Sequence, residues 1–301
     1  MRRFQVSAIL AGALLAGCAS AAAPAAPPQH PHELADYQPP TPLQLSATTV
    51  RTYVAPEADQ GVAVDAHSFY AIDNSMIAKY DIATGELQAG WAGPAHGLIR
   101  HMNSCFAEAG KLWCANSNYS LTPMGSSIEV FDARRMTHID SHSLGMTDEG
   151  SLVWFGRLDG GWIAGFAHYD ETGGLTFKDH RFSSVVTFDA DWRRTGGWLF
   201  PADILERMAP HAASGGVIGP DGLLYVLGHD RQEMYVLARP DMGPVLIHVA
   251  TISLQAEGQA FSWSKAGDRT IYTVDRHHGQ VLAISLPAVD IAGFPDARRF
   301  R

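Results

Sequence analysis

The stretch that decides the fold is residues 215–230, GGVIGPDGLLYVLGHD. Its apolar residues form two short runs, and the Gly-Pro-Asp-Gly between them is typical of a tight turn. Apolar runs of this length, bounded by Gly, Pro and Asp, are typical of two strands joined as a hairpin. The stretch therefore predicts an antiparallel strand pair whose second strand ends at the polar residues His229 and Asp230.

Four other segments repeat the second half of this pattern, in which an aromatic residue lies inside a short apolar strand and a polar turn follows. These segments are SFYAIDN (68–74), KLWCANS (111–117), GWIAGFAHYD (161–170) and TIYTVDRHH (270–278). Successive aromatic residues lie about 40 to 65 residues apart, a spacing typical of β-propellers, in which each repeat is one four-stranded sheet.

Each of the five segments has an apolar strand on either side. The preceding strands are GVAVD (61–65), MNSCF (102–106), SLVWF (151–155), GGVIG (215–219) and GQAFSW (258–263). The following strands are MIAKYD (76–81), SIEVFD (127–132), SVVTFD (184–189), EMYVLAR (233–239) and QVLAISL (280–286). In the third repeat, residues 201–208 interrupt the strands and predict a short helix with Pro201 near its first turn.

Four of the repeats carry an outer strand, whereas the last one ends without it. Residues 48–55, TTVRTYVA, precede the first repeat and can fill that place. Closing the ring in this way removes an exposed sheet edge. We predict an all-β protein, a β-propeller of five four-stranded blades closed by an N-terminal strand, with six or seven blades as open alternatives.

The first 18 residues, MRRFQVSAILAGALLAGC, have the layout of a secretory signal: two arginines, a short apolar run and small residues. Leu15 to Cys18 resembles the bacterial lipobox, which implies a signal peptide over 1–17 and a lipid on Cys18. The alternative is an ordinary signal cleaved at an Ala-x-Ala site near residues 19–23. Because Ala19 follows the cysteine, the resemblance implies the periplasmic face of the outer membrane.

The Ala- and Pro-rich residues 18–45 predict an extended tether, and residues 46–301 then form the propeller domain. The formal net charge of −9 argues against nucleic-acid binding and against a basic membrane-binding surface. We therefore expect a monomer that contacts the membrane only through its lipid.

Two other cysteines flank the sequence FAEAGKLW. A hairpin with its turn near Ala109-Gly110 pairs Phe106 with Trp113 and Cys105 with Cys114. In an oxidising compartment this pairing predicts a disulfide, and two buried free thiols are the alternative.

The Gly-Pro-Asp-Gly turn followed by LLYV resembles a pattern of the senescence-marker and gluconolactonase-type propellers. The body of the chain is also similar to exported bacterial β-propeller lipoproteins that carry a cycloisomerase-like label. The gluconolactonase resemblance implies a divalent metal held by a Glu, two Asn and an Asp. In this chain those parts fall to Glu257 or Glu149, Asn103, Asn116 and Asp275, although that family has six blades against the five repeats seen here.

In a propeller, the loop before the first strand of a blade and the loop after its second strand open on one face. This rule predicts a central funnel with nine ligand-binding residues: His101, Asn103, Asn116, His168, Asp170, His229, Asp230, Gln259 and Asp275. A Glu-Gly pair occurs before two of the strands, which places Glu149 and Glu257 as candidate general bases. The oxygen ligands suit calcium, and the histidines would admit zinc or manganese. The alternative is that these residues only close turns, where Asp, Asn and Gly are common.

Our leading interpretation is an envelope lipoprotein that binds a small polar molecule in its funnel and hydrolyses or isomerises a lactone-like ester with metal assistance. The second is a scaffold without enzymatic activity that binds another envelope protein, like the propeller lipoprotein of the outer-membrane barrel-assembly machinery. A third is a role similar to that of the propeller-type glutaminyl cyclases.

Overall fold

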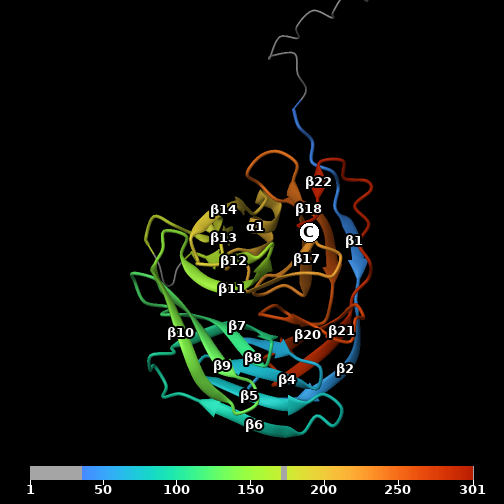
Figure 1. The fold of residues 1–301 in the computed structure, drawn as a ribbon. Helices are drawn as coiled ribbons and strands as arrows, with labels where there is room; N and C mark the ends of the chain where they lie inside the picture. Colours follow the sequence, from blue (N-terminus) through green and yellow to red (C-terminus); the bar gives the residue numbers. More distant parts are fainter. Residues whose placement is uncertain (1–35, 171–174, 301) are drawn as a thin grey trace, which may run out of the picture. The chain divides into compact units, whose positions relative to one another are not determined.

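The computed structural model describes residues 36–170 and 175–300. In it, each sequence repeat forms one four-stranded antiparallel sheet (Figure 1). We number the sheets as blades 1 to 5. Blade 1 comprises β3 (Gly61–Val64), β4 (Ser68–Asp73), β5 (Met76–Asp81) and β6 (Leu87–Ala92). Blade 2 comprises β7 (His101–Glu108), β8 (Lys111–Ser117), β9 (Gly125–Asp132) and β10 (Thr137–Met146).

The later blades follow the same plan. Blade 3 comprises β11 (Ser151–Leu158), β12 (Gly161–Ala167), β13 (Ser184–Phe188) and β14 (Arg194–Leu199). Blade 4 comprises β15 (Gly215–Ile218), β16 (Leu224–Leu227), β17 (Glu233–Pro240) and β18 (Ile247–Ser253). Blade 5 comprises β19 (Ser262–Trp263), β20 (Thr270–Asp275), β21 (Gln280–Ser285) and β2 (Thr48–Val54).

The ring closes as the sequence predicted. Strand β2 pairs antiparallel with β21, with Tyr53 opposite Val281, so a strand from the N-terminal side completes the last blade. The first strands of neighbouring blades contact one another: β3 contacts β7, β7 contacts β11, β11 contacts β15, and β19 contacts β3. These first strands therefore surround the central axis, and the prediction of a five-bladed propeller is confirmed.

Blade 4 carries two additional short strands. Strand β1 (Leu43–Ser46) pairs parallel with the outer strand β18, and β22 (Ala297–Arg298) pairs with β17. Residues 43–45, which the sequence analysis assigned to the tether, thus lie at the outer edge of blade 4. There they hydrogen-bond to backbone groups of β18 that face away from β17.

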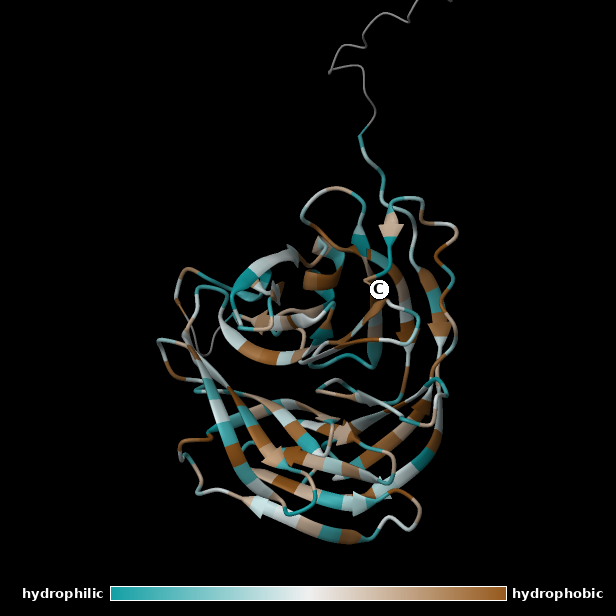
Figure 2. Ribbon diagram, viewed as in Figure 1, coloured by the Kyte–Doolittle hydropathy of each residue, from teal (hydrophilic) through white to brown (hydrophobic). Residues whose placement is uncertain are grey.

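Hydrophobic residues recur along the strands (Figure 2), and the core consists of five clusters, each between two neighbouring blades. Trp154 is fully buried between blades 3 and 4. A Cβ atom on Gly165 or Gly216 would lie within 2.4 Å of its indole ring, so these two glycines make room for the tryptophan. The predicted helix is α1 (Ala202–Met208), which buries Ile204 and Met208 in the same cluster.

Two local predictions are confirmed as well. Cys105 and Cys114 lie opposite each other on β7 and β8, form a disulfide, and are buried. In the hairpin of residues 215–230, the Asp221 carboxylate accepts a hydrogen bond from the Tyr225 hydroxyl at 2.6 Å. Blade 1 repeats this contact between Asp65 and Tyr70, also at 2.6 Å, so the aromatic repeat includes an Asp-Tyr bond in two blades.

The described part of the chain contains no helix that is long and apolar enough to cross a membrane.

Candidate ligand-binding site

The second strand of every blade ends on one face, which we call the upper face. These strands end at Asp73, Ser117, Ala167, Leu227 and Asp275. One or two residues later, each blade presents a polar or aromatic side chain to this face: Asn74, Tyr119, Tyr169, His229 and Arg276. The repeat thus brings together five side chains that are distant in the sequence.

Five aromatic rings form a chain across the upper face, which we call the ring belt. The centroid of His101 lies 5.1 Å from that of Tyr119, and Tyr119 lies 5.3 Å from Tyr169. Tyr169 lies 5.3 Å from His211, and His211 lies 4.0 Å from His229. The belt therefore runs from blade 2 through blade 3 to blade 4, with imidazoles at both of its ends.

Blades 1 and 5 contact the two ends of the ring belt. The Nδ1 atom of His101 hydrogen-bonds to Oδ1 of Asn74 in blade 1. At the other end, Nη1 of Arg276 in blade 5 lies 3.4 Å from Nε2 of His229. Because arginine can only donate, this contact favours the His229 tautomer that carries its proton on Nδ1.

Asp230 joins the two histidines at the blade 4 end. Its two carboxylate oxygens lie 2.7 Å from Nδ1 of His211 and 2.6 Å from Nδ1 of His229. Burial lowers the pKa of His229, and the nearby His211 and Arg276 lower it further, while Asp230 acts in the opposite direction. Burial would raise the pKa of Asp230, but the hydrogen bonds from both histidines outweigh it and lower that pKa.

Arg276 is half-buried and, within residues 36–170 and 175–300, forms no ion pair with a carboxylate. Two carboxylates lie nearby, because Glu257 and Asp275 line the same cavity of about 10 Å³, which has room for about one water. However, Glu257 contacts Nε2 of His277 at 2.7 Å, and Asp275 contacts Nδ1 of His278 at 2.8 Å. Among the described residues, no carboxylate therefore forms an ion pair with the guanidinium at the end of the belt.

Burial also shifts the other titratable members of the belt. Burial lowers the pKa of His101 to about 4, against the opposing charges of Asp59 and Asp73. Burial, and after it the Tyr119 hydroxyl, raise the pKa of Tyr169 to about 12. At neutral pH His101 and Tyr169 are thus uncharged, and the charged groups gather at blades 4 and 5.

Two of the predicted funnel residues, Asn116 and Asn103, use their side-chain amides to hydrogen-bond to neighbouring parts of the protein. The Oδ1 atom of Asn116 accepts from the backbone N–H groups of Arg100 and His101, both at 3.1 Å, and its amide donates to Ser127. The amide of Asn103 donates to the backbone oxygen of Leu152 at 3.4 Å. Both asparagines are buried and hold the start of β7 in place.

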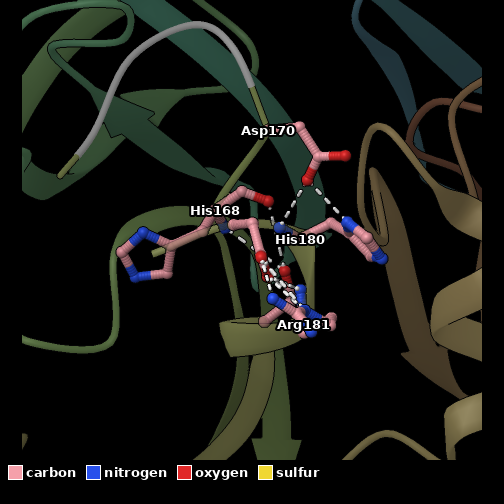
Figure 3. Close-up of polar contacts among 6 residues, drawn as sticks. His168, Asp170, His180 and Arg181 are labelled. Atoms are coloured by element: carbon pink, nitrogen blue, oxygen red, sulfur yellow. Dashed lines mark hydrogen bonds and ion pairs between the residues drawn. The ribbon is translucent and has the colours of Figure 1, made fainter. Parts of the chain in front are cut away.

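His168 and Asp170, from the turn after β12, do not act together. His168 is 2% exposed, and its ring nitrogens lie beside the backbone of Asp148 and Glu149 without reaching hydrogen-bond geometry with any described residue. Figure 3 shows its ring pointing away from the pair formed by Asp170 and His180, which contact each other at 2.5 Å. Burial lowers the pKa of His168, and the charge of Lys178 adds to this.

The two candidate bases also differ in their surroundings. The Glu149 carboxylate contacts Nε of Arg194, on the outer strand β14, at 2.8 Å. Glu257 lines the cavity beside His229. Gln259 is buried, its φ is +77°, and its backbone N–H points to the Gly228 oxygen at 3.4 Å. Of these three residues, Glu257 is the one that lines a cavity together with a member of the ring belt, His229.

The metal ligands implied by the gluconolactonase resemblance do not fit a single ion. The oxygen of Asn116 is occupied by two backbone donors, and the amide of Asn103 faces a backbone oxygen. Glu257 and Asp275 each contact a neighbouring histidine. Another set with suitable chemistry is present: ligand atoms of His211, His229 and Asp230 all lie within 4.8 Å of one another.

Sequence reasoning missed four residues of this site: Tyr119, Tyr169, His211 and Arg276. Three of them follow a second strand, at the positions from which other funnel residues were chosen, but the selection favoured acids, amides and histidines. A selection that included every side chain at those positions would have found them. His211 lies between α1 and β15, and no strand pattern marks that position.

Two larger open hollows lie elsewhere. One of about 550 Å³ includes Asp159, Arg239 and Arg298 in its lining, and one of about 410 Å³ includes Trp162 and Trp198. Both include the turn between β11 and β12, which is at the opposite end of the strands from the upper face. Arg298 is already paired with Asp241 at 3.0 Å. The upper face remains the place where titratable side chains from several blades meet.

The comparisons with known proteins add little to this picture. No protein-family model matches the chain, and no curated protein matches it. A solved structure described as "Crystal Structure of Mitotic Checkpoint Complex" is similar over 86% of this chain and 98% of that chain, with 10% sequence identity and a TM-score of 0.40. The architecture itself, a β-propeller, is a fold that supports ligand binding or interaction with other molecules.

Proposed function

We propose that the upper face of this propeller binds a small polar molecule that carries a carboxylate. The observation that supports this most is Arg276, a half-buried guanidinium beside His229 with no ion-pair partner in the parts of the chain that the structure describes. Guanidinium groups recognise carboxylates through paired, charge-assisted hydrogen bonds. The neighbouring rings of Tyr169 and Tyr119 offer flat surfaces against which the rest of the molecule can pack.

The finer proposal concerns the reaction. Hydrolysis of a lactone yields a hydroxy acid, whose carboxylate is the group that Arg276 is suited to bind. Water would add to the lactone carbonyl carbon and the ring C–O bond would break. Glu257, which lines the cavity beside His229, would take the proton from water and return it to the departing ring oxygen. Glu149 is less suited to this role, since it contacts Arg194 on the outer strand β14 and does not line this cavity.

We place this activity at the periplasmic face of the outer membrane, with Cys18 as the lipid anchor. That part of the proposal is supported by the sequence LAGC after the apolar run. Residues 1–35, including Cys18, lie outside the described residues.

The first test measures the binding of gluconate, a hydroxy acid with one carboxylate, by isothermal titration calorimetry. We expect saturable binding by the wild type and a loss of roughly tenfold or more for Arg276→Gln, because a charge-assisted pair contributes about 1.5–3 kcal/mol. Arg231→Gln is the matched control, since Arg231 is exposed, lies in the turn after β16, and makes no belt contact. Equal weakening by both variants would point to a general charge effect and contradict the proposal.

The second test separates binding from catalysis. Glu257→Gln should bind gluconate as the wild type does. Its rate of glucono-δ-lactone hydrolysis should fall to the uncatalysed rate. Unchanged turnover in this variant would remove Glu257 as the base. If neither gluconate nor the lactone binds, and an envelope protein binds the wild type and Arg276→Gln equally, the scaffold interpretation replaces the present one.

A further inference from the structure

We propose that His211, His229 and Asp230 form a binding site for one divalent transition-metal ion of the zinc class. Their ligand atoms, two imidazole nitrogens and a carboxylate oxygen, lie within 4.8 Å of one another. Two histidines and one carboxylate are a known ligand set for zinc with an open fourth position. The same donor types also suit other divalent transition metals.

The three side chains are held in place from two directions. His229 and Asp230 directly follow β16, and His211 comes from the loop after α1, where its backbone N–H donates to the Met208 oxygen at 3.0 Å. Tyr169 packs edge-on against the His211 ring, with an interplanar angle of 87°. A metal ion would therefore meet ligands that are already gathered, at little cost in side-chain entropy.

The site is reachable from solvent. The side chains of His211, His229 and Asp230 are 31%, 20% and 45% exposed. The two imidazoles now share the carboxylate through their Nδ1 atoms, at 2.7 and 2.6 Å. An ion bound by these Nδ1 atoms and by one Asp230 oxygen would replace two N–H groups, and the carboxylate would offset part of its positive charge. The His229 proton would then lie on Nε2, so Arg276 would give up its contact with that atom and be free to bind another group.

Acidic side chains outnumber the single guanidinium around the three ligands. The groups that face His229 from neighbouring elements are His211, Asp230 and Arg276, with Glu257 and Asp275 on the wall of the adjoining cavity. Three nearby carboxylates against one guanidinium leave this region attractive to a cation.

A second cluster, Asp170, Asp179 and His180, is a weaker candidate. Its ligand atoms are also within 4.8 Å of one another. However, both oxygens of Asp179 accept hydrogen bonds from Arg181, Oδ1 from Nε at 3.0 Å and Oδ2 from Nη2 at 2.5 Å. A bidentate arginine pair of this kind competes strongly with a metal ion for the carboxylate. This cluster therefore supplies the matched control.

The metal site deepens the proposed function, on which the following step rests. With three protein ligands, the ion would keep an open position. Nη1 of Arg276 lies 3.4 Å from Nε2 of His229, at the other end of that imidazole from Nδ1. A hydroxy acid could then be bound by the metal and by Arg276 together. We expect zinc to increase gluconate affinity in the wild type and to have no such effect in Arg276→Gln.

The deciding experiment measures metal binding without any organic ligand. Zn²⁺ titrated into the metal-free protein should bind with a stoichiometry of one, and Co²⁺ in its place should give the visible absorption of a low-symmetry nitrogen and oxygen site. His211→Ala and Asp230→Asn should each weaken zinc binding by roughly 10- to 100-fold. Asp170→Asn should leave it unchanged. Both affected positions are partly exposed, so these variants are expected to fold, and their circular dichroism checks this.

Two results would overturn the site: zinc binding that survives both His211→Ala and Asp230→Asn, or zinc binding that is lost in Asp170→Asn. Failure here is distinct from failure of the proposed function, because gluconate binding is measured in metal-free protein. Tight zinc binding without gluconate binding would keep the metal site and reject the hydroxy-acid proposal.

Discussion

Two turns on the upper face have similar sequences and different environments. His168 and Asp170 follow β12 in blade 3, and His229 and Asp230 follow β16 in blade 4. In blade 3 the histidine is buried and its ring nitrogens make no hydrogen bond within the described residues. In blade 4 the histidine is bonded to Asp230 and lies next to Arg276.

A Glu-Gly pair lies against each turn, but it comes from a different place in the blade order. Gly150 directly precedes β11 and lies against Ala167 and His168 of its own blade. Gly258 lies four residues before β19 begins, and it packs against Gly228 and His229 of the preceding blade. Similar motifs therefore pack against their own blade in one place and against the preceding blade in the other.

The largest expected effect concerns these two glycines. At Gly150 and Gly258, φ is +108° and +146°, and a Cβ would lie within 2.5 Å of a backbone oxygen. Gly150→Ala and Gly258→Ala should each lower the free energy of unfolding by about 2–4 kcal/mol. The control is Gly243→Ala, where φ is +96° but nothing lies within 4 Å of the added Cβ, with an expected cost of about 1 kcal/mol. Denaturant unfolding measures all three, and equal losses would show that packing against the turns does not matter.

A smaller effect concerns the buried imidazole. His168→Leu removes ring nitrogens that have no hydrogen-bond partner among the described residues, so at pH 7.5 it should raise the free energy of unfolding by about 1 kcal/mol. The lowered pKa of His168 favours the neutral ring in the folded state. Above pH 6.5, the ordinary pKa of histidine, the titration of His168 therefore does not reduce the free energy of unfolding. As the pH falls below 6.5, the unfolded chain takes up the proton more readily than the folded protein, and the free energy of unfolding decreases progressively.

We therefore expect the variant to lose less stability between pH 7 and 5 than the wild type, as followed by urea unfolding at several pH values. His229→Leu is the comparison, because it breaks the bond to Asp230 and should not be stabilising at pH 7.5. A His168→Leu variant with reduced stability at pH 7.5 would show that His168 has a polar role.

The smallest effect distinguishes the two glutamates. Both lie in ion pairs with partly exposed partners, Arg194 and His277, so Glu149→Gln and Glu257→Gln should each change stability by less than about 1 kcal/mol. Only Glu257 lines the cavity beside His229. Its loss should weaken zinc binding roughly two- to threefold, as a surface charge effect. Zinc titration of both variants checks this. If Glu149→Gln weakens zinc binding as much as Glu257→Gln does, the position of Glu257 beside His229 does not matter for the metal.

Much of the fold was predictable because it rests on local patterns. The aromatic strands, the turn at 219–222 and the opposed cysteines each depend on residues close in sequence, and all are found where predicted. The strand TTVRTYVA could be placed in the last blade because that blade lacked one strand. Strand β1 was missed, since LQLS has little length or alternation to distinguish it from the preceding Pro-rich residues.

The candidate site was less predictable. The funnel rule located the upper face, and His101, His229, Asp230, Glu257 and Asp275 lie there. The rule could not foresee that Asn116 would use its oxygen on two backbone N–H groups, or that Glu149 would pair with an outer strand. These outcomes depend on side-chain direction, which the position of a residue relative to a strand does not specify.

The sequence by itself determined the propeller, its five repeats, the closing strand and the disulfide, because strand length, turn composition and repeat spacing are properties of neighbouring residues. Only the tertiary structure decided which polar side chains meet. His211 approaches His229 because α1 returns its loop to blade 4, and Arg276 reaches the same ring from blade 5. Such contacts join residues from different blades, and their distances follow from how the blades pack around the axis.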